Sequence, residues 1–155
     1  MPGDELAVWI GVSPLTDWAI RRASEEDIES VLRLWLSAGG PASVGATREA
    51  LSRLLATDRD ALLLAEFGDA VVGSLIAGWD GWRGSFYRLA VDPAHRRRGL
   101  ATALLREGER QLRERGALRL TAIVAEGDAA ASGFWTAAGY RRQADRTRFV
   151  RSAHG

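Results

Sequence analysis

Two stretches in the first half of the chain carry apolar residues at every third or fourth position, the spacing that places them on one face of an α-helix. Ahead of the first stretch, Ser24 precedes Asp27 by three residues, which approximates a capping box. We expect that helix to run to about Ser37 and to be broken by Gly39-Gly40-Pro41. Thr47 is expected to cap the second helix, whose apolar positions are leucines.

The same spacing returns twice in the second half of the chain. One helix is expected to begin at Gly99 or Leu100 and to end at Gly116. Its apolar face comprises Leu100, Ala101, Leu104, Leu105, Gly108 and Leu112. Two charged pairs are expected on its solvated side, namely Glu109 with Arg113 and Arg110 with Glu114. Asp128 is expected to cap a fourth helix that ends near Gly139.

Apolar runs rich in β-forming residues separate the helical stretches and predict strands. The expected strands are residues 18–22, 61–67, 70–79, 85–91, 118–124 and 146–150. Gly68-Asp69 is expected to join the second and third of them as a hairpin. The resulting order, β-α-α-β-β-β-α-β-α-β, predicts an α+β fold, a mixed α/β layer built around one sheet.

Composition narrows the function more than the fold. The 155 residues are expected to form one domain over residues 16–155, after a leader of residues 1–15 in which Val8-Trp9-Ile10 could extend a sheet edge. A net charge of +1 argues against a dedicated nucleic-acid binder. The absence of cysteine excludes disulfides, thiolate metal ligands and a cysteine acyl-enzyme, and His95 and His154 are too isolated to suggest a metal site. Without a signal-peptide pattern or a membrane-length apolar run, the expected location is the cytoplasm.

Residues 89–102 carry the strongest chemical signal. An apolar run ends at Asp92-Pro93, the three arginines 96–98 follow, and a helical pattern begins after Gly99. A helix start presents unpaired backbone N–H groups and a partial positive charge, and three adjacent arginines repel one another unless an anion is bound. Glycine at 99 and alanine at 101 permit close approach of a phosphate. This pattern predicts a phosphate-binding loop, with an ordinary helix start and a solvated basic cluster as the plain alternative.

The pattern Arg96-x-x-Gly99-x-Ala101, after the strand residues Leu89-Ala90-Val91, resembles the acetyl-CoA pyrophosphate loop of the GNAT superfamily of N-acetyltransferases. The resemblance covers residues 18–150 and implies that family's fold, a single domain with a central, mostly antiparallel sheet flanked by four helices. It implies that the main chain of Leu89, Ala90 and Val91 binds the pantetheine arm and that the Val91 N–H polarises the acetyl carbonyl. The resemblance places the pyrophosphate at Arg96, Arg97, Arg98, Gly99, Leu100, Ala101 and Thr102. The implied cosubstrate is acetyl-CoA, with no metal.

A second motif, from Asp128 to Tyr140, resembles the family pattern Asn-x-x-Ala-x-x-Phe-Tyr-x-x-x-Gly-Phe. Matched backwards from Gly139, Asp128 stands at the asparagine, Ala131 at the alanine and Trp135 at the tyrosine, which assigns all three to coenzyme binding. In the family that tyrosine often protonates the departing thiolate, but an indole N–H does not release its proton near neutral pH. Trp135 is therefore expected to orient the thioester, or simply to pack its helix. Because a thiol has a pKa of about 8.5, its thiolate leaves without a dedicated acid.

The acceptor amine needs a base as well. Many relatives place a glutamate on the strand that ends in valine, but residues 85–91 contain no carboxylate. Glu126, Asp128 and Asp80 are the alternatives, acting directly or through water.

Three other features are weaker candidates for the site. Tyr87 is expected to alternate onto the face of Leu89 and Val91, where it could hydrogen-bond a ligand, although a core aromatic is the simpler interpretation. Trp79, Asp80 and Trp82 could line a pocket for a cationic amine, or could simply pack an edge strand. His95 is expected on the loop surface, without a catalytic role.

These features together predict direct acetyl transfer from acetyl-CoA to an amine, with a small molecule favoured over a peptide N-terminus. One rival is a coenzyme A-binding regulatory module without catalysis, suggested by Trp135 and the strand that lacks a carboxylate. The other is an arginine-rich nucleic-acid binder, which the near-zero net charge disfavours. We expect neither nucleic acid nor membrane as a partner. The sequence leaves the oligomeric state open, a homodimer included.

Overall fold

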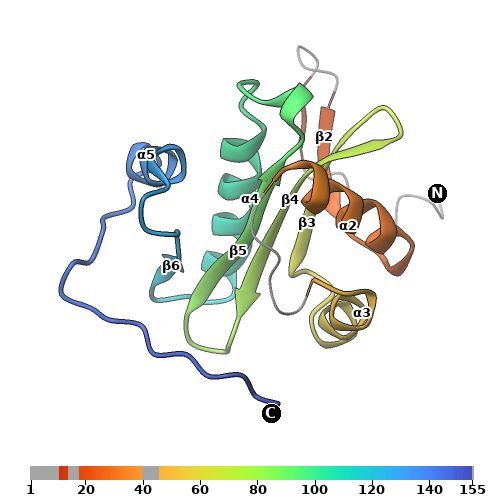
Figure 1. Cartoon of the computed structure of the whole chain (residues 1–155). Coiled ribbons are helices and arrows are strands. Elements are labelled where there is room, and N and C mark those ends of the chain that lie inside the picture. Colours follow the sequence, from red (N-terminus) through yellow and green to blue (C-terminus); the bar gives the residue numbers. More distant parts are fainter. Residues whose placement is uncertain (1–10, 14–17, 40–45, 155) are drawn as a thin grey trace. The chain divides into compact units, whose positions relative to one another are not determined.

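A computed structural model describes residues 11–13, 18–39 and 46–154. The chain divides into two compact units, one ending at Ile123 and the other beginning at Val124 (Figure 1). The expected edge residues Val8-Trp9-Ile10, and most of the expected leader, lie outside the described residues. The expectation of one domain over residues 16–155 stays a prediction.

The first unit is built around a mixed sheet whose strands lie in chain order, β1 to β6, within the described residues. The strands are β1 (Gly11–Ser13), β2 (Trp18–Arg22), β3 (Leu62–Phe67), β4 (Ala70–Trp79), β5 (Gly84–Val91) and β6 (Leu120–Ala122). Each neighbouring pair is antiparallel except β5 and β6, which run parallel. The prediction of an α+β fold with a mostly antiparallel sheet is confirmed.

Four α-helices and two short 3-10 helices lie in the described residues. They are η1 (Glu25–Asp27), α2 (Ile28–Ser37), α3 (Arg48–Thr57), η2 (Pro93–His95), α4 (Leu100–Glu114) and, in the second unit, α5 (Ala129–Ala137). Thr47 caps α3 and Asp128 caps α5, as expected from the sequence. The Thr47 hydroxyl accepts from the Ala50 N–H at 3.1 Å, and the Asp128 carboxylate accepts from the Ala131 N–H at 3.0 Å.

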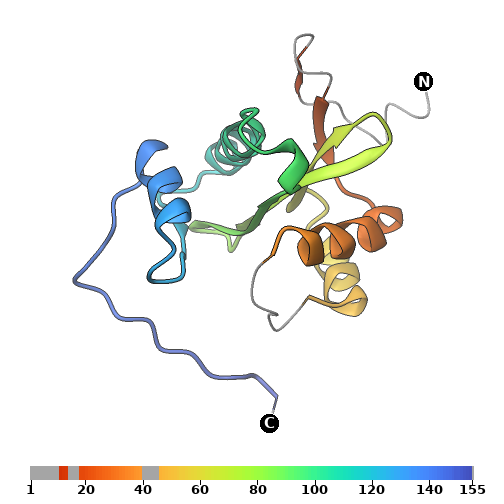
Figure 2. The ribbon, with the colours of Figure 1, turned by 45° about the horizontal axis from the view of Figure 1, so that its top comes forward.

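Helices cover both faces of the sheet in the first unit. Helix α4 lies on one face, and α2 and α3 lie on the other (Figure 2). The core under α2 and α3 includes Ile28, Val31, Leu51, Leu62 and Leu64. On the opposite face α4 packs so closely that a Cβ at Gly108 would lie 2.9 Å from the Phe86 ring. Each fully buried Leu or Ile side chain in these layers contributes about 1.5–3 kcal/mol to folding.

An ion-pair cluster ties the start of the first helical segment to the sheet. The Arg21 guanidinium donates to both carboxylate oxygens of Asp27, at 2.7 and 2.8 Å, and to Glu66 at 2.6 Å. Partial burial of Asp27 favours its neutral form, but hydrogen bonds from Arg21 and Ser24 outweigh burial and hold the pKa of Asp27 below its ordinary value. The carboxylate is therefore ionised at neutral pH and holds β2, β3 and η1 together.

In one of the two charged pairs expected on the solvated side of α4, the acidic residue is buried and the arginine is exposed. The Glu109 side chain is only 3% exposed, and Arg106 and Arg113 reach its carboxylate from the exposed side of the helix, Arg106 at 2.7 Å. Both arginine side chains are more than half exposed, so the buried carboxylate is paired with guanidinium groups that remain accessible to water. The other pair, Arg110 with Glu114, is exposed as expected, at 2.7 Å.

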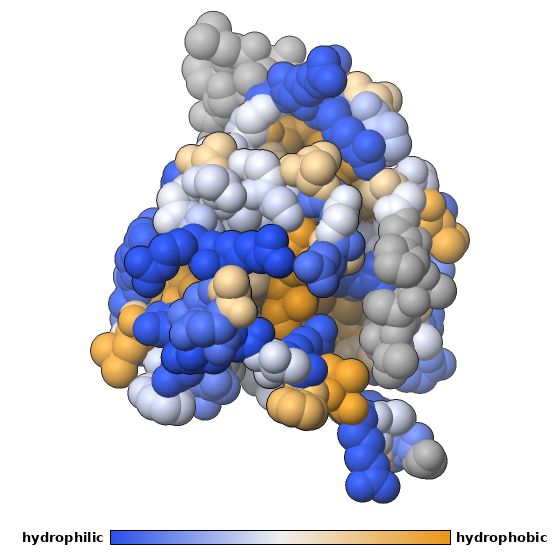
Figure 3. All heavy atoms as spheres, turned by 60° about the vertical axis from the view of Figure 1, so that its left-hand side comes forward, coloured by the Kyte–Doolittle hydropathy of each residue, from blue (hydrophilic) through white to orange (hydrophobic). Residues whose placement is uncertain are grey.

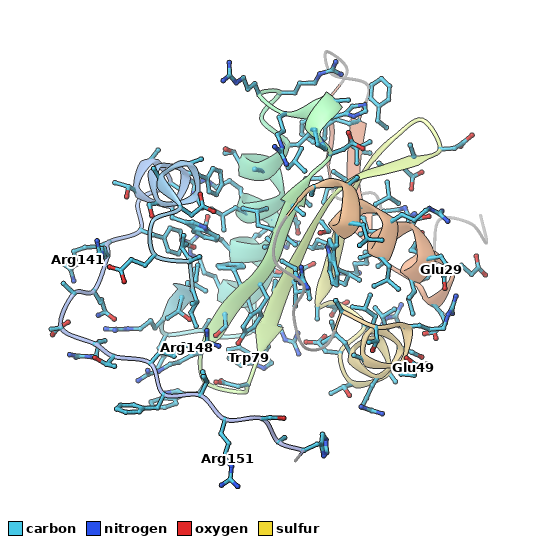
Figure 4. The ribbon with its side chains drawn as sticks, in the orientation of Figure 1. Glu29, Glu49, Trp79, Arg141, Arg148 and Arg151 are labelled. Carbon is cyan, nitrogen blue, oxygen red and sulfur yellow. The ribbon has the colours of Figure 1, made fainter. Side chains whose placement is uncertain are left out.

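The prediction of a last strand at residues 146–150 is wrong. Residues 141–154 have no regular secondary structure. Their arginines, among them Arg148 and Arg151, are distributed along this segment (Figure 4). Figure 3 shows this end of the chain as mainly hydrophilic, and Phe149 is 92% exposed. Phe149 and Val150 are adjacent, so they cannot share one face of a strand, and the arginines around them provide no apolar face to bury.

The strand expected at residues 118–124 is shorter than predicted. It contains Leu120–Ala122, because its parallel ladder with β5 extends over three residues only. A parallel strand depends on its neighbour for every backbone hydrogen bond, so its length follows the partner. Among the described residues, no helix combines the length and the apolar character needed to cross a membrane.

Candidate functional site

A β-bulge interrupts the pairing of β4 with β5. Ser74 lies opposite Ala90 and Ile76 lies opposite Tyr87, so two residues of β5, Arg88 and Leu89, oppose one residue of β4. Arg88 has a φ of +54°, in the left-handed region that non-glycine residues seldom adopt. Such a bulge bends the strand and changes the face on which the following side chains lie.

A buried hydrogen-bond chain holds this bulge in place. The Trp35 indole N–H, from α2, donates to the Ser74 hydroxyl at 2.8 Å, and that hydroxyl donates to the Arg88 carbonyl at 3.0 Å. Ser74 is fully buried, and the Arg88 guanidinium carbon lies 4.5 Å from the centroid of the Trp35 ring. The carbonyl that the bulge removes from the ladder is therefore satisfied inside the protein.

The bulge corrects the expected orientation of Tyr87. Because Tyr87 pairs with Ile76 and Ala90 pairs with Ser74, Tyr87 shares a face with Ala90 and not with Leu89 and Val91. Tyr87 is also 49% exposed, so it is not a core aromatic. Simple alternation gives the wrong face because the bulge adds one residue to β5.

Strands β5 and β6 pair only at their first residues. The ladder joins Gly84–Phe86 to Leu120–Ala122, and the hydroxyls of Ser85 and Thr121 lie 3.2 Å apart across it. Strand β5 then continues to Val91, beyond the end of β6 (Figure 1). The edge of β5 from Tyr87 to Val91 therefore lies past this ladder, where backbone groups can pair with an extended ligand.

The loop after β5 forms a helix start suited to an anion. The Asp92 carboxylate accepts from the Ala94 N–H at 2.9 Å and so begins η2. Gly99, with a φ of +81°, is the N-cap of α4, and the first helical hydrogen bond runs from the Ala103 N–H to the Gly99 carbonyl at 3.0 Å. The N–H groups of residues 100–102 precede that bond and lie at the positive end of the helix dipole.

The three arginines of this loop differ in their contacts. The Arg96 side chain donates to the Val91 carbonyl at 3.2 Å and to the Ala38 carbonyl at 2.8 Å, which ties the end of β5 to the end of α2. Arg97 and Arg98 are exposed, and Arg97 has a φ of +64°. Arg96 thus shapes the loop, while Arg97 and Arg98 lie on its surface.

His95 packs against Phe67 of β3 and lies near Asp92. Its ring centroid lies 5.3 Å from that of Phe67, and its Nδ1 lies 3.7 Å from the Asp92 carboxylate. The ring is only partly exposed, in contrast to the surface position expected from the sequence. These contacts are those of a packing residue.

The turn between β4 and β5 lies far from Val91. The Asp80 carboxylate accepts from the N–H groups of Trp82, at 2.8 Å, and Arg83, at 2.6 Å, and these bonds lower the pKa of Asp80. The turn lies at the start of β5, seven residues before Val91, which is roughly 23 Å at strand spacing. Asp80 is thus a weakened base at the wrong end of the strand, and Trp79 and Trp82 lie there with it.

In the second unit, the motif residues surround α5. Asp128 caps the helix, and the N–H that it binds belongs to Ala131. The Trp135 ring makes edge contacts with Phe134, at 5.4 Å between centroids, and with Tyr140, at 4.9 Å. Glu126 is exposed and pairs with Arg142 at 3.2 Å. The cap gives Asp128 a structural role, which leaves Glu126 the more accessible of the two carboxylates.

The structure thus brings the main chain of residues 89–91 and the loop 96–102 into one continuous strand–loop–helix segment. Sequence reasoning missed the bulge and its Trp35–Ser74 support. The available signal was weak, a serine within the apolar run of β4 and a tryptophan on the apolar face of α2. Both are common in ordinary cores.

The chain matches known proteins over most of its length. The family model described as "Acetyltransferase (GNAT) family" matches residues 15–140. An acetyltransferase of Yersinia pestis is 35% identical over 124 residues, which are 80% of this chain and 88% of that protein.

Solved structures share the fold. Ard1 from Thermoplasma volcanium superposes with a TM-score of 0.74 at 23% identity, covering 83% of this chain and 85% of that one. An aminoglycoside N-acetyltransferase in complex with CoA gives a TM-score of 0.66 at 16% identity, covering 88% of this chain and 95% of that one.

Proposed function

The chain belongs to the acetyltransferase (GNAT) family, and from that premise we propose that it moves an acetyl group from acetyl-CoA directly to the amine of a small molecule. The observation that carries the proposal is the strand–loop–helix segment, in which a bulged strand edge leads to a helix start at Gly99. A small-molecule acceptor is supported by the aminoglycoside acetyltransferase that shares the fold.

The main chain of Leu89, Ala90 and Val91 would bind the pantetheine arm along the β5 edge beyond the β6 ladder. The pyrophosphate would lie at residues 96–102, against the first N–H groups of α4 and the exposed Arg97 and Arg98. Arg96 holds the loop in shape through the Val91 and Ala38 carbonyls. From the resemblance of the second motif to the family pattern, Asp128, Ala131 and Trp135 are proposed to bind coenzyme A as well.

The proposed reaction is a single transfer in a ternary complex. The acceptor nitrogen attacks the thioester carbonyl carbon while the Val91 N–H stabilises the developing oxyanion. The C–S bond then breaks, the thiolate of coenzyme A leaves, and the nitrogen loses a proton. With no cysteine in the chain, transfer proceeds without a cysteine acyl-enzyme.

Proton transfer would rest on groups outside β5, which contains no carboxylate. Glu126 is the preferred base, through water, with Asp128 second because it also caps α5. Trp135 would orient the thioester without donating a proton. Water, or the ammonium of the tetrahedral intermediate, would protonate the departing thiolate, since the pKa of a thiol is about 8.5.

A thermal-shift series tests the proposed coenzyme. A ligand at 100 times its dissociation constant stabilises the folded state by about 2.7 kcal/mol, so acetyl-CoA is expected to raise the melting temperature clearly. NAD and ATP at equal concentration are expected to do much less, because they lack the pantetheine arm. An equal shift with all three nucleotides, or none with acetyl-CoA, contradicts the assignment.

A coenzyme A-binding regulatory module is the second candidate, favoured by tryptophan at position 135 and by the carboxylate-free β5. It would show the acetyl-CoA shift but no transfer to any amine. A peptide N-terminus remains the alternative acceptor, distinguished by assaying peptides beside small amines.

A further inference from the structure

The bulge in β5 places a cationic side chain beside the proposed acetyl site. Building on the proposed function, we propose that the acceptor is an amine that also carries a carboxylate, and that Arg88 binds this carboxylate. Arg88 would then be the residue that determines acceptor specificity.

The register of β4 with β5 gives the position of Arg88. Tyr87 lies opposite Ile76, on the face covered by α2 and α3, and Arg88 contacts Trp35 of α2 on that same face. Arg88 and the exposed Tyr87 therefore both lie on the α2 side, three or four residues before Val91 and about 10–13 Å from it along the strand.

This side of β5 differs from the edge proposed for the coenzyme. The pantetheine arm would run along the edge beyond β6, whereas Arg88 points toward α2. An acceptor held by Arg88 would approach the thioester from the α2 face. Two substrates that meet at one strand from different directions are what a ternary-complex reaction requires.

The backbone at Arg88 supports a role for its side chain. A φ of +54° is adopted far more readily by glycine or asparagine than by arginine. Unfavourable backbone conformations of this kind concentrate at functional sites, where the side chain is needed in that orientation. A purely structural bulge at this position would be better served by glycine.

The contact with Trp35 orients the guanidinium. The guanidinium carbon lies 4.5 Å from the centroid of the Trp35 ring, and a guanidinium carries its N–H donors around its edge, in its own plane. The Trp35 ring is itself held by its hydrogen bond to the buried Ser74. A planar fork fixed in this way matches the two oxygens of a carboxylate.

The neighbouring side chains complement a carboxylate. The Tyr87 hydroxyl adds a second donor on the same face, and β5 contributes no acidic residue that would repel an anion. The acceptor amine would remain free to lie toward Val91 while its carboxylate is held at the bulge.

The test compares acceptors in pairs. α-Amino acids, β-alanine and γ-aminobutyrate are each assayed beside the corresponding carboxamide, with a polyamine included, at saturating acetyl-CoA. For the wild-type protein, at least one carboxylate form is expected to exceed its carboxamide in kcat/KM by about tenfold or more, the range of a charge-assisted hydrogen bond.

Two variants and one control assign the preference to Arg88. Arg88→Asn keeps a residue that accepts the positive φ but removes the charge, so the carboxylate form is expected to lose its advantage while the carboxamide changes little. Arg88→Lys keeps the charge without the fork and is expected to retain part of the preference. Arg97→Asn replaces the other arginine of positive φ, and because its proposed role is in coenzyme binding it is expected to leave the ratio between the two acceptors unchanged.

The outcomes separate this inference from the proposed function. A preference for amines without a carboxylate, or equal losses for both members of a pair in Arg88→Asn, overturns the inference and leaves acetyl transfer standing. Transfer to no amine, with acetyl-CoA still bound, overturns both.

Discussion

At position 99 the backbone conformation limits the choice of residue, whereas the surrounding space does not. Gly99 has a φ of +81°, and a Cβ added there would meet nothing within 4 Å. The space that a side chain would enter is the space that the pyrophosphate is proposed to occupy.

Gly99→Asn separates the requirement for a positive φ from the requirement for space beside the pyrophosphate. Asparagine tolerates the left-handed region, so the melting temperature of the free protein is expected to change little. Coenzyme A affinity, measured by isothermal titration, is expected to fall about tenfold or more, which corresponds to about 1.4 kcal/mol. Gly99→Val, the comparison variant, is expected to lose stability as well, by about 1–3 kcal/mol. Unchanged affinity in Gly99→Asn would mean that no ligand approaches this residue.

Trp135 permits a second test at single-residue scale. If the indole orients the thioester without protonating it, Trp135→Phe is expected to keep coenzyme affinity and to reduce turnover only modestly. Trp135→Tyr introduces a phenol, the proton donor that the family pattern has at this position, and is expected to match or exceed the wild type at a pH below the thiol pKa of about 8.5.

A hundredfold loss of turnover in Trp135→Phe, with fold and binding intact, would assign the indole N–H a direct part in the reaction. Circular dichroism and a coenzyme titration serve as controls. They are needed because Trp135 contacts Phe134 and Tyr140.

At the scale of elements, the bulge of β5 depends on a support from two other elements. Helix α2 contributes Trp35 and β4 contributes Ser74, and together they satisfy the Arg88 carbonyl. The chain of hydrogen bonds is buried, so each member depends on the others.

A double-mutant cycle on Trp35 and Ser74 tests this support. Ser74→Ala leaves both the indole N–H and the Arg88 carbonyl buried without this hydroxyl, and is expected to cost about 1–3 kcal/mol in urea unfolding. Trp35→Phe removes the donor and the larger ring. The two losses are expected to be non-additive by about 0.5 kcal/mol or more. Additive losses would show that the pair does not act as one unit.

The ion pair between β2 and η1 predicts an acid dependence of stability. The pKa of Asp27 is lower in the folded protein than the unfolded value of about 3.9, so its contribution is fully present above that value. The contribution is lost as the pH falls through the folded pKa. Asp27→Asn is expected to be less stable at pH 7 and to lose less stability than the wild type below about pH 4. Parallel stability curves for the two proteins over that range would contradict this account.

At the scale of the whole molecule, local signals predicted most element boundaries. Strands β2 and β4 have the expected bounds, and helix α2 ends at the expected residue. Thr47 caps α3 and Gly116 follows the end of α4 as expected, because such signals act within a few residues. The phosphate-loop prediction was likewise local, since its residues are contiguous.

Features that depend on distant partners were not predictable in this way. The bulge at Arg88 needs Ser74 and Trp35, which belong to two other elements. The length of β6 is limited by its ladder with β5, and residues 146–150 form no strand despite two apolar residues. Periodicity along one segment contains no information about such neighbours.

The central claim, direct acetyl transfer to a small amine, is most directly tested with isotopically labelled acetyl-CoA. The protein is incubated with the labelled cosubstrate and the small-molecule fraction of a cell extract supplemented with the amine panel, and the products are analysed by mass spectrometry. The account predicts that the label moves into an N-acetylated amine only when the protein is present. Label that stays in acetyl-CoA or appears only as acetate, while the coenzyme binds, would contradict it.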